Sequence, residues 1–135
     1  MENKNICANL PPVLALAYLG DARHALYVRL RLVEKGLSKS SSLNSEALKY
    51  VTAEAQAKMY SKIEGELTSD EADVFKRAFN STHLNKPKRA SGKDYRVATG
   101  FEAVIGMLTY LGNEDRLRFI LDKTFEEGME NDTEN

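Results

Sequence analysis

The sequence is poor in the residues that mark secreted and membrane proteins. It has one cysteine, Cys7, no tryptophan and three prolines among 135 residues. A lone cysteine forms no internal disulfide, which counts against the disulfide-stapled secreted domains. No run reaches the ~18 apolar residues of a membrane span, and residues 1–12 lack the apolar core of a secretory signal. We therefore expect a cytoplasmic protein with no membrane segment and no catalytic role for Cys7.

Several common catalytic motifs are also missing. The two histidines, His24 and His83, have neither the spacing nor the partners of a zinc site. We expect His24 on a helix surface and His83 in a loop. No GxGxxG or Walker sequence is present, and no serine lies in a nucleophile-elbow setting. These absences count against zinc, dinucleotide, P-loop and serine-hydrolase chemistry.

The apolar residues that are present recur at helical spacing along the whole chain, which predicts an all-α fold. The length suits one domain, with a core from about residue 10 to 128 and a flexible acidic C-terminal tail. A polar linker is expected at Ser38–Ser42. The expected helices are Pro11 to about Lys35, ended by Gly36; Ser45–Tyr50; Thr52 to about Gly65; one opened by a capping box at Thr68–Glu71; one capped by Asp94; and Glu114–Glu127, ended by Gly128.

Asp21 lies where an apolar residue is expected. The apolar stripe that surrounds it consists of Leu14, Ala17, Tyr18, Ala25, Val28 and Leu32. A buried carboxylate is costly unless a cation, a metal or hydrogen-bond donors meet it. The preceding Gly20 costs about 1 kcal/mol in mid-helix relative to Ala, which indicates the close approach of a second helix. The simpler alternative is that Asp21 only pairs with Arg23, Arg29 or a neighbouring helix.

Glu102 is a second acid in an apolar environment. It belongs to Phe101–Leu111, a run that is apolar on nearly every face and is therefore expected in the core. Two acids in two apolar helices point to one shared site, because paired carboxylates hold Mg²⁺ through hard oxygen ligands. Such an ion activates water for attack on a phosphodiester.

Basic residues concentrate in one segment, 76–96. This segment contains a single acid, Asp94, and has a local charge of +6 in a chain whose net charge is −1. The basic residues are Lys76, Arg77, Lys86, Lys88, Arg89, Lys93 and Arg96. The asymmetry predicts contact with a polyanion, and the alternative is a solvated loop. No aromatic ladder accompanies the charges, so backbone contact with a duplex is favoured over stacking on a single strand.

Two motifs resemble those of the ribonuclease III family. LALAYLGDA (Leu14–Ala22) resembles the signature helix, which ends in Leu-Gly-Asp-Ala. FEAVIGMLTYL (Phe101–Leu111) resembles the second motif, Phe-Glu-Ala-x-x-Gly-Ala-x-Tyr-Leu. Their order and separation also match. Two earlier acids of the signature helix fall on Leu14 and Ala17, and the acid that precedes Glu102 falls on Thr99. The chain leaves no room for a C-terminal double-stranded-RNA-binding domain and so resembles the Mini-III ribonucleases.

The resemblance implies a ribonuclease III endonuclease-type helical domain that works as a homodimer. It implies a Mg²⁺-dependent endoribonuclease (with Mn²⁺ as a substitute) that cleaves double-stranded RNA and leaves 5′-phosphate and 3′-hydroxyl ends. The implied substrate is precursor 23S ribosomal RNA, with room for assistance by a ribosomal protein. Asp21 and Glu102 are the expected metal ligands. The expected RNA contacts are Arg77, Asn80, Lys86, Lys88, Arg89, Lys93 and Arg96.

Two rival functions remain open at this point. The first is a non-catalytic RNA-binding or ribosome-associated protein on the same fold, because family acids are missing. The second is a plain helical interaction protein with buried ion pairs. Metal-dependent cleavage separates the enzyme from the first rival, and duplex-RNA affinity at low salt separates it from the second.

Overall fold

The computed structural model describes residues 9–82 and 92–133, and the surroundings of side chains up to Phe125. These residues form helices and contain no strand, so the predicted all-α fold is confirmed. The helices are α1 (Val13–Glu34), α2 (Ser40–Val51), α3 (Ala53–Tyr60), α4 (Ser69–Asn80), α5 (Gly92–Leu111) and α6 (Glu114–Thr133), with a 3₁₀ turn at Glu64–Glu66. Within the described ranges, no helix is both long and apolar enough to cross a membrane.

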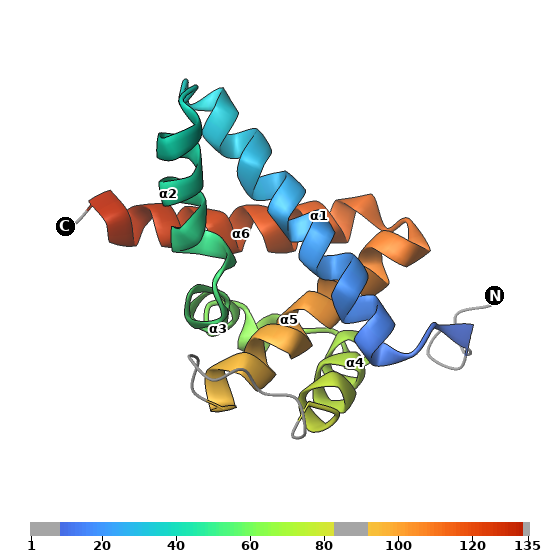
Figure 1. Ribbon diagram of the computed structural model, residues 1–135. Helices are drawn as coiled ribbons and strands as arrows, with labels where there is room; N and C mark the ends of the chain where they lie inside the picture. The colour runs from blue at the N-terminus through green and yellow to red at the C-terminus, as the bar shows by residue number, and fades with distance from the viewer. Residues whose placement is uncertain (1–8, 83–91, 134–135) are drawn as a thin grey trace.

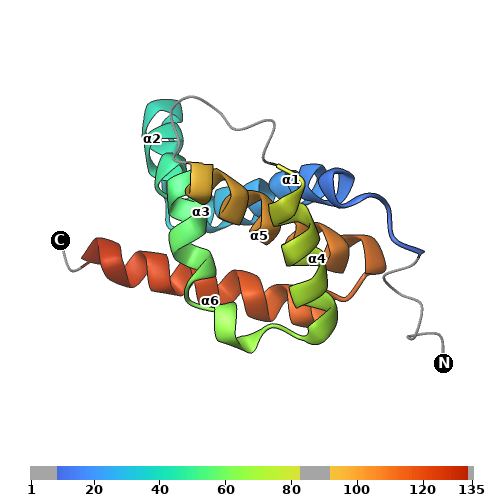
Figure 2. The same ribbon diagram turned by 90° about the horizontal axis from the view of Figure 1, so that it is seen from below.

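Helix α5 is the centre of the molecule. It packs against α1, α3, α4 and α6, and α1 crosses over it in Figure 1. Figure 2 shows α5 between α3 and α4. Ten residues of α5, nearly a continuous run from Ala98 to Leu108, are buried. The run that reads as apolar on every face is therefore the core helix, as the sequence predicts.

The helix ends follow local signals in the sequence. Helix α1 begins after Pro12, and Gly36 follows its end with φ +95°, the left-handed conformation that glycine adopts at low cost. The side chain of Thr52 accepts a hydrogen bond from the Ala55 amide at the start of α3. Thr68 and Glu71 form the predicted capping box at the start of α4.

Other boundaries differ from the prediction. Helix α2 begins at Ser40 and includes part of the expected linker. Asp94 lies in the first turn of α5, which begins at Gly92, and is not its N-cap. Helix α6 continues through Gly128 to Thr133, so the expected stop there is wrong. An isolated glycine costs a helix only about 1 kcal/mol, which the good helix formers around Gly128 offset.

The phase of α1 also differs from the predicted stripe. Its buried residues are Leu16, Ala17, Gly20, His24, Tyr27, Val28 and Leu32. Leu14 and Tyr18 of the predicted stripe are exposed, and Tyr18 has 84% of its surface accessible. A helix with apolar residues on more than one face does not show in its sequence which face is buried. Periodicity alone therefore predicts the wrong face for part of α1.

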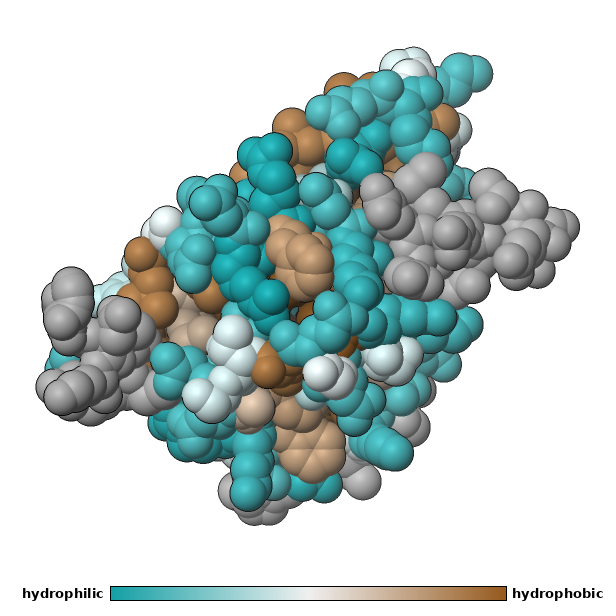
Figure 3. All heavy atoms as spheres, turned by 180° about the vertical axis from the view of Figure 1, so that it is seen from behind, coloured by the Kyte–Doolittle hydropathy of each residue, from teal (hydrophilic) through white to brown (hydrophobic). Residues whose placement is uncertain are grey.

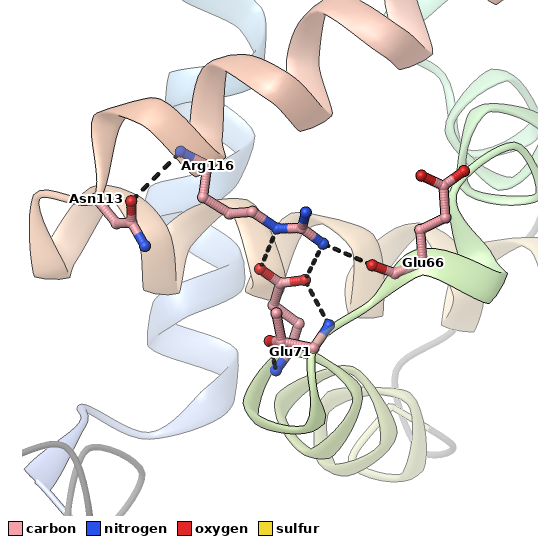
Figure 4. A network of polar contacts seen from close by, with 5 residues as sticks. Glu66, Glu71, Asn113 and Arg116 are labelled. Atoms are coloured by element: carbon pink, nitrogen blue, oxygen red, sulfur yellow. Dashed lines mark hydrogen bonds and ion pairs between the residues drawn. The ribbon is translucent and has the colours of Figure 1, made fainter.

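An ion pair joins the start of α4 to α6 (Figure 4). The guanidinium of Arg116 donates to both carboxylate oxygens of Glu71 at 2.8 Å and to the Glu66 carbonyl at 2.7 Å. The hydrogen bonds with Glu71 raise the pKa of Arg116 above its usual range. Glu71 is buried and also accepts from the Thr68 amide. The same carboxylate therefore caps α4 and attaches it to α6.

Candidate active site

The site forms where the backbones of α1 and α5 touch. A Cβ atom on Gly20 would lie 1.7 Å from the Glu102 carbonyl oxygen and 2.8 Å from the Gly106 amide nitrogen. A Cβ on Gly106 would lie 1.8 Å from the Leu16 carbonyl oxygen. Only glycine fits at both positions, which confirms the close approach predicted from Gly20. The contact places Asp21, the residue after Gly20, directly beside Glu102.

Asp21 and Glu102 meet at this crossing. Their side chains lie within hydrogen-bonding contact of each other. Burial first, and then the hydrogen bond and charge of Asp21, raise the pKa of Glu102 to about 8. Asp21 itself is exposed, so the predicted burial is wrong for Asp21, while Glu102 is half-buried. Two carboxyl groups in this arrangement repel each other when both are ionised, and a cation relieves that repulsion.

A buried polar pair lies next to the two acids. Gln56 is 1% exposed, and its Nε2 lies 3.1 Å from Nδ1 of His24, which is also buried. The Gln56 side chain hydrogen-bonds Glu102 and lowers the pKa of that carboxyl group. The predicted surface position of His24 is wrong, and burial lowers the pKa of His24 to about 4. The sequence has no signal for Gln56, which lies in another helix, far from both acids along the chain.

Four of the predicted RNA-contact residues lie in the last turn of α4 or the first turns of α5: Arg77, Asn80, Lys93 and Arg96. Arg77 is exposed and pairs with Asp73 at 3.1 Å, and Asn80 ends α4. Lys93 is exposed in the first turn of α5. The predicted contacts Lys86, Lys88 and Arg89, and also His83, lie outside the described residues.

Arg96 has partners within the protein. Its guanidinium carbon lies 4.3 Å from the centre of the Phe79 ring, and its Nε donates to the Phe79 carbonyl at 3.2 Å. These contacts join the end of α4 to the start of α5. Arg96 therefore fixes the two helix ends between which the basic segment runs.

Comparison with known proteins agrees with this architecture. The Ribonuclease III domain profile matches residues 14–113. A Mini-ribonuclease 3 from Streptococcus pneumoniae is 41% identical over 118 residues, which cover 86% of this chain and 92% of the relative. A Mini-ribonuclease 3 from Symbiobacterium thermophilum is 43% identical over 112 residues, 83% and 85% of the two chains.

A crystal structure of a protein from Fusobacterium nucleatum has a TM-score of 0.81 at 28% identity, covering 89% of this chain and 96% of that one. The chain belongs to the Mini-ribonuclease 3 branch of the ribonuclease III family. Its helices form an endoribonuclease domain of the ribonuclease III type, and the glycine crossing brings the two family motifs together.

The chain lacks carboxylates where the resemblance expects further acids. Leu14 is exposed and Ala17 is buried on α1. Thr99 is buried on α5 and donates its hydroxyl to the Tyr95 carbonyl at 2.9 Å. Within the described part of the chain, no cluster of three or more His, Cys, Asp or Glu residues is arranged for a metal ion.

The two remaining carboxylates suit Mg²⁺. They are hard oxygen ligands, and Mg²⁺ is commonly held by one or two carboxylates together with waters and substrate phosphates. Burial and the neighbouring Asp21 carboxyl group raise the pKa of Glu102, and a bound cation would favour the ionised form of both acids. The residues present therefore fit a divalent cation whose remaining ligands come from water and RNA.

Proposed function

We propose that this protein is a Mg²⁺-dependent endoribonuclease that cleaves double-stranded RNA in the cytoplasm, with Mn²⁺ as a substitute ion. The hydrogen-bonded carboxyl pair at the glycine crossing carries this proposal. Asp21 and Glu102 hold the ion, and Asp21 faces solvent, from which the RNA phosphate approaches. When bound, the ion supplies an activated water and stabilises the leaving oxygen of the phosphodiester.

The expected substrate is precursor 23S ribosomal RNA, trimmed in its paired end region with or without a ribosomal protein. Support comes from the family resemblance and from the basic segment next to α5. Arg77, Asn80 and Lys93 lie at its edges, and Arg96 holds these edges together. We propose that Lys86, Lys88 and Arg89, between them, contact the phosphates.

We propose that the enzyme is a homodimer that associates through α1. The helix carries exposed apolar side chains along one side, at intervals of three, four or eight residues: Leu14, Tyr18, Leu26, Leu30 and Val33. On the face opposite to that of Figure 1, apolar residues are scattered among hydrophilic ones (Figure 3). A long apolar stripe on one helix suits a self-complementary two-fold contact. Two sites related by a two-fold axis match the two strands of an RNA duplex.

Light scattering tests the dimer directly. Tyr18→Glu places a charge in the middle of the stripe and is expected to give a folded monomer. Tyr110→Glu, at an exposed tyrosine on the end of α5, is the matched control and is expected to remain dimeric. A dimeric Tyr18→Glu would exclude this face as the interface.

Cleavage of a precursor 23S stem tests the activity. Wild-type protein with Mg²⁺ is expected to produce defined fragments with 5′-phosphate and 3′-hydroxyl ends, and none in EDTA. Asp21→Asn and Glu102→Gln are each expected to lower the rate at least 100-fold, with helical circular dichroism unchanged, because each removes a hard ligand. Near-normal cleavage by either variant in saturating Mg²⁺ would contradict the two-acid site.

The rival function is a non-catalytic RNA-binding or ribosome-associated protein. It is favoured by the loss of family acids at Leu14, Ala17 and Thr99. Against it stands the retained and paired Asp21–Glu102 site. Tight binding of the duplex without cleavage in Mg²⁺ or Mn²⁺ would establish the rival.

A further inference from the structure

We propose that Gln56 is a positioning residue for Glu102. Its side-chain amide nitrogen bridges His24 and Glu102 and holds the Glu102 carboxyl group in the orientation that accepts a cation. The inference rests on the proposed function, in which Asp21 and Glu102 hold the ion. It adds a residue from a third helix to a site otherwise built by α1 and α5.

The position of Gln56 is fixed by its own helix. The Thr52 side chain caps α3, and the backbone N–H of Gln56 donates to the Thr52 carbonyl at 2.9 Å. Helix α3 packs directly on α5, which places Gln56 at 1% exposure against the core. A buried amide is costly unless its polar atoms have partners. The hydrogen bonds with His24 and Glu102 therefore offset the cost of burying the Gln56 side chain.

The chemistry of the amide settles the direction of both hydrogen bonds. A glutamine side chain has one donor atom, Nε2, which carries two protons. A side-chain hydrogen bond joins Gln56 to Glu102, and an ionised carboxylate can only accept, so Gln56 donates to it through Nε2. The same nitrogen lies 3.1 Å from His24 Nδ1. One proton thus serves each partner, and the His24 ring accepts through an unprotonated Nδ1.

The His24 ring is itself held in place. It is buried and lies edge-on to Phe101, with the ring centres 5.7 Å apart and an angle of 74° between the planes. Phe101 is the neighbour of Glu102 in α5 and is completely buried. The bridge therefore has a rigid anchor at one end and the Glu102 carboxyl group at the other. Hydrogen bonds that orient metal ligands in this way typically matter 10- to 100-fold for metal affinity or activity.

Replacement of Gln56 by methionine tests the bridge. Gln56→Met has a side chain of similar length, suits an apolar site and lacks the donor. We expect the affinity for Mn²⁺, measured by calorimetry without RNA, to fall roughly 10-fold. For cleavage of duplex RNA we expect kcat at fixed Mg²⁺ to fall by a similar factor, with KM for RNA unchanged. The melting temperature in EDTA should remain close to that of the wild type.

Two further variants serve as controls for the role of Gln56. Thr124→Val removes a buried hydroxyl from α6, a helix that supplies no residue of the proposed site, and is expected to leave Mn²⁺ affinity and kcat unchanged. His24→Phe removes the anchor but leaves the donor, so its effect on Mn²⁺ affinity should be smaller and in the same direction. If Gln56→Met does not fold, His24→Phe reports on the same bridge.

The outcomes separate this inference from the proposed function. Wild-type Mn²⁺ affinity and kcat in Gln56→Met would overturn the role of Gln56, and so would a loss confined to KM for RNA. Cleavage that survives Asp21→Asn would overturn the proposed site instead. In that case the calorimetric comparison of wild type with Gln56→Met still measures whether Gln56 supports cation binding.

Discussion

At the scale of single residues, the acid pair makes stability depend on pH. In the metal-free protein the pKa of Glu102 is raised from 4.5 to about 8. Between these values the folded state keeps a proton that the unfolded state has lost, so stability falls as pH rises. The pKa of His24 is lowered from 6.5 to about 4, so its contribution rises with pH over that interval. Of these two groups, Glu102 is the one whose contribution still changes above pH 6.5.

We therefore predict that the melting temperature in EDTA falls between pH 6.5 and 8.5. Glu102→Gln is expected to melt at a higher temperature than wild type at pH 8.5 and to lose this fall. Added Mg²⁺ should stabilise the wild type more than the variant, because the ion binds the ionised Glu102 carboxylate and Gln lacks that charge. Circular dichroism melting curves at several pH values measure all three effects. A wild-type protein that is equally stable at pH 6.5 and 8.5 in EDTA would contradict the prediction.

At the scale of helices, the crossing of α1 and α5 tolerates no side chain. We predict that Gly20→Ala destabilises the fold by at least about 3 kcal/mol, since the new Cβ would overlap backbone atoms that have no rotamer to change. Urea unfolding gives the free energy. Any folded Gly20→Ala is expected to cleave poorly, because the carboxyl groups are pushed apart.

Gly65→Ala is the matched control for the crossing. Gly65 lies in the 3₁₀ turn, and a Cβ there meets nothing within 4 Å. Its unfolding free energy should stay within about 0.5 kcal/mol of wild type. Equal behaviour of the two alanine variants would mean that the backbones do not touch at Gly20.

The attachment of α4 to α6 depends on a buried charge. We predict that Arg116→Met costs about 3–5 kcal/mol, because it leaves the buried Glu71 carboxylate without its cation. Glu71→Gln combined with Arg116→Met should recover much of the loss, since the amide oxygen still caps α4. Arg77→Met, which breaks the exposed pair with Asp73, is expected to cost less than about 1 kcal/mol. Urea unfolding of the four proteins decides, and a double variant no better than Arg116→Met would exclude charge burial as the cause.

The sequence predicts local features well and contacts between helices poorly. The capping box at Thr68, the end of α1 at Gly36 and the central place of α5 follow from neighbouring residues alone. Gly20 and Glu102 stand out because each is unusual in its own helix. Gln56 and His24 do not, since their pairing depends on how α3 and α1 pack on α5. The prediction of the buried face of α1 is partly wrong for a related reason: one apolar face of the helix packs in the core and another is exposed.

At the scale of the whole molecule, the basic charges are expected to act through phosphate contacts. We predict that Ala at Lys86, Lys88, Arg89 and Lys93 weakens binding to duplexes of any sequence. The slope of log K against log salt should become shallower by up to about 3.6, because binding of the variant releases fewer counterions. The melting temperature should barely change. Binding titrations at several salt concentrations measure the slope.

The control removes the same charge elsewhere. It replaces three lysines and one arginine that are exposed in the structure: Lys35, Lys39, Lys58 and Arg118. This variant has the same net charge as the test variant, so general electrostatic attraction falls equally in both. Identical RNA affinities for the two variants would mean that segment 86–93 makes no specific contact.

The place where α1 and α5 touch also has a mechanical meaning. A helix that is held against another at one point can rotate about that point, and the displacement of each residue grows with its distance from the contact. The far end of α1 lies about 20 Å along its axis from Gly20, whereas Asp21 and Glu102 stand beside the pivot. A rotation of α1 about this contact would therefore displace the helix ends far more than it would change the spacing of the two carboxyl groups. The absence of a Cβ atom at Gly20 and at Gly106 thus holds together two carboxyl groups that lie far apart in the sequence.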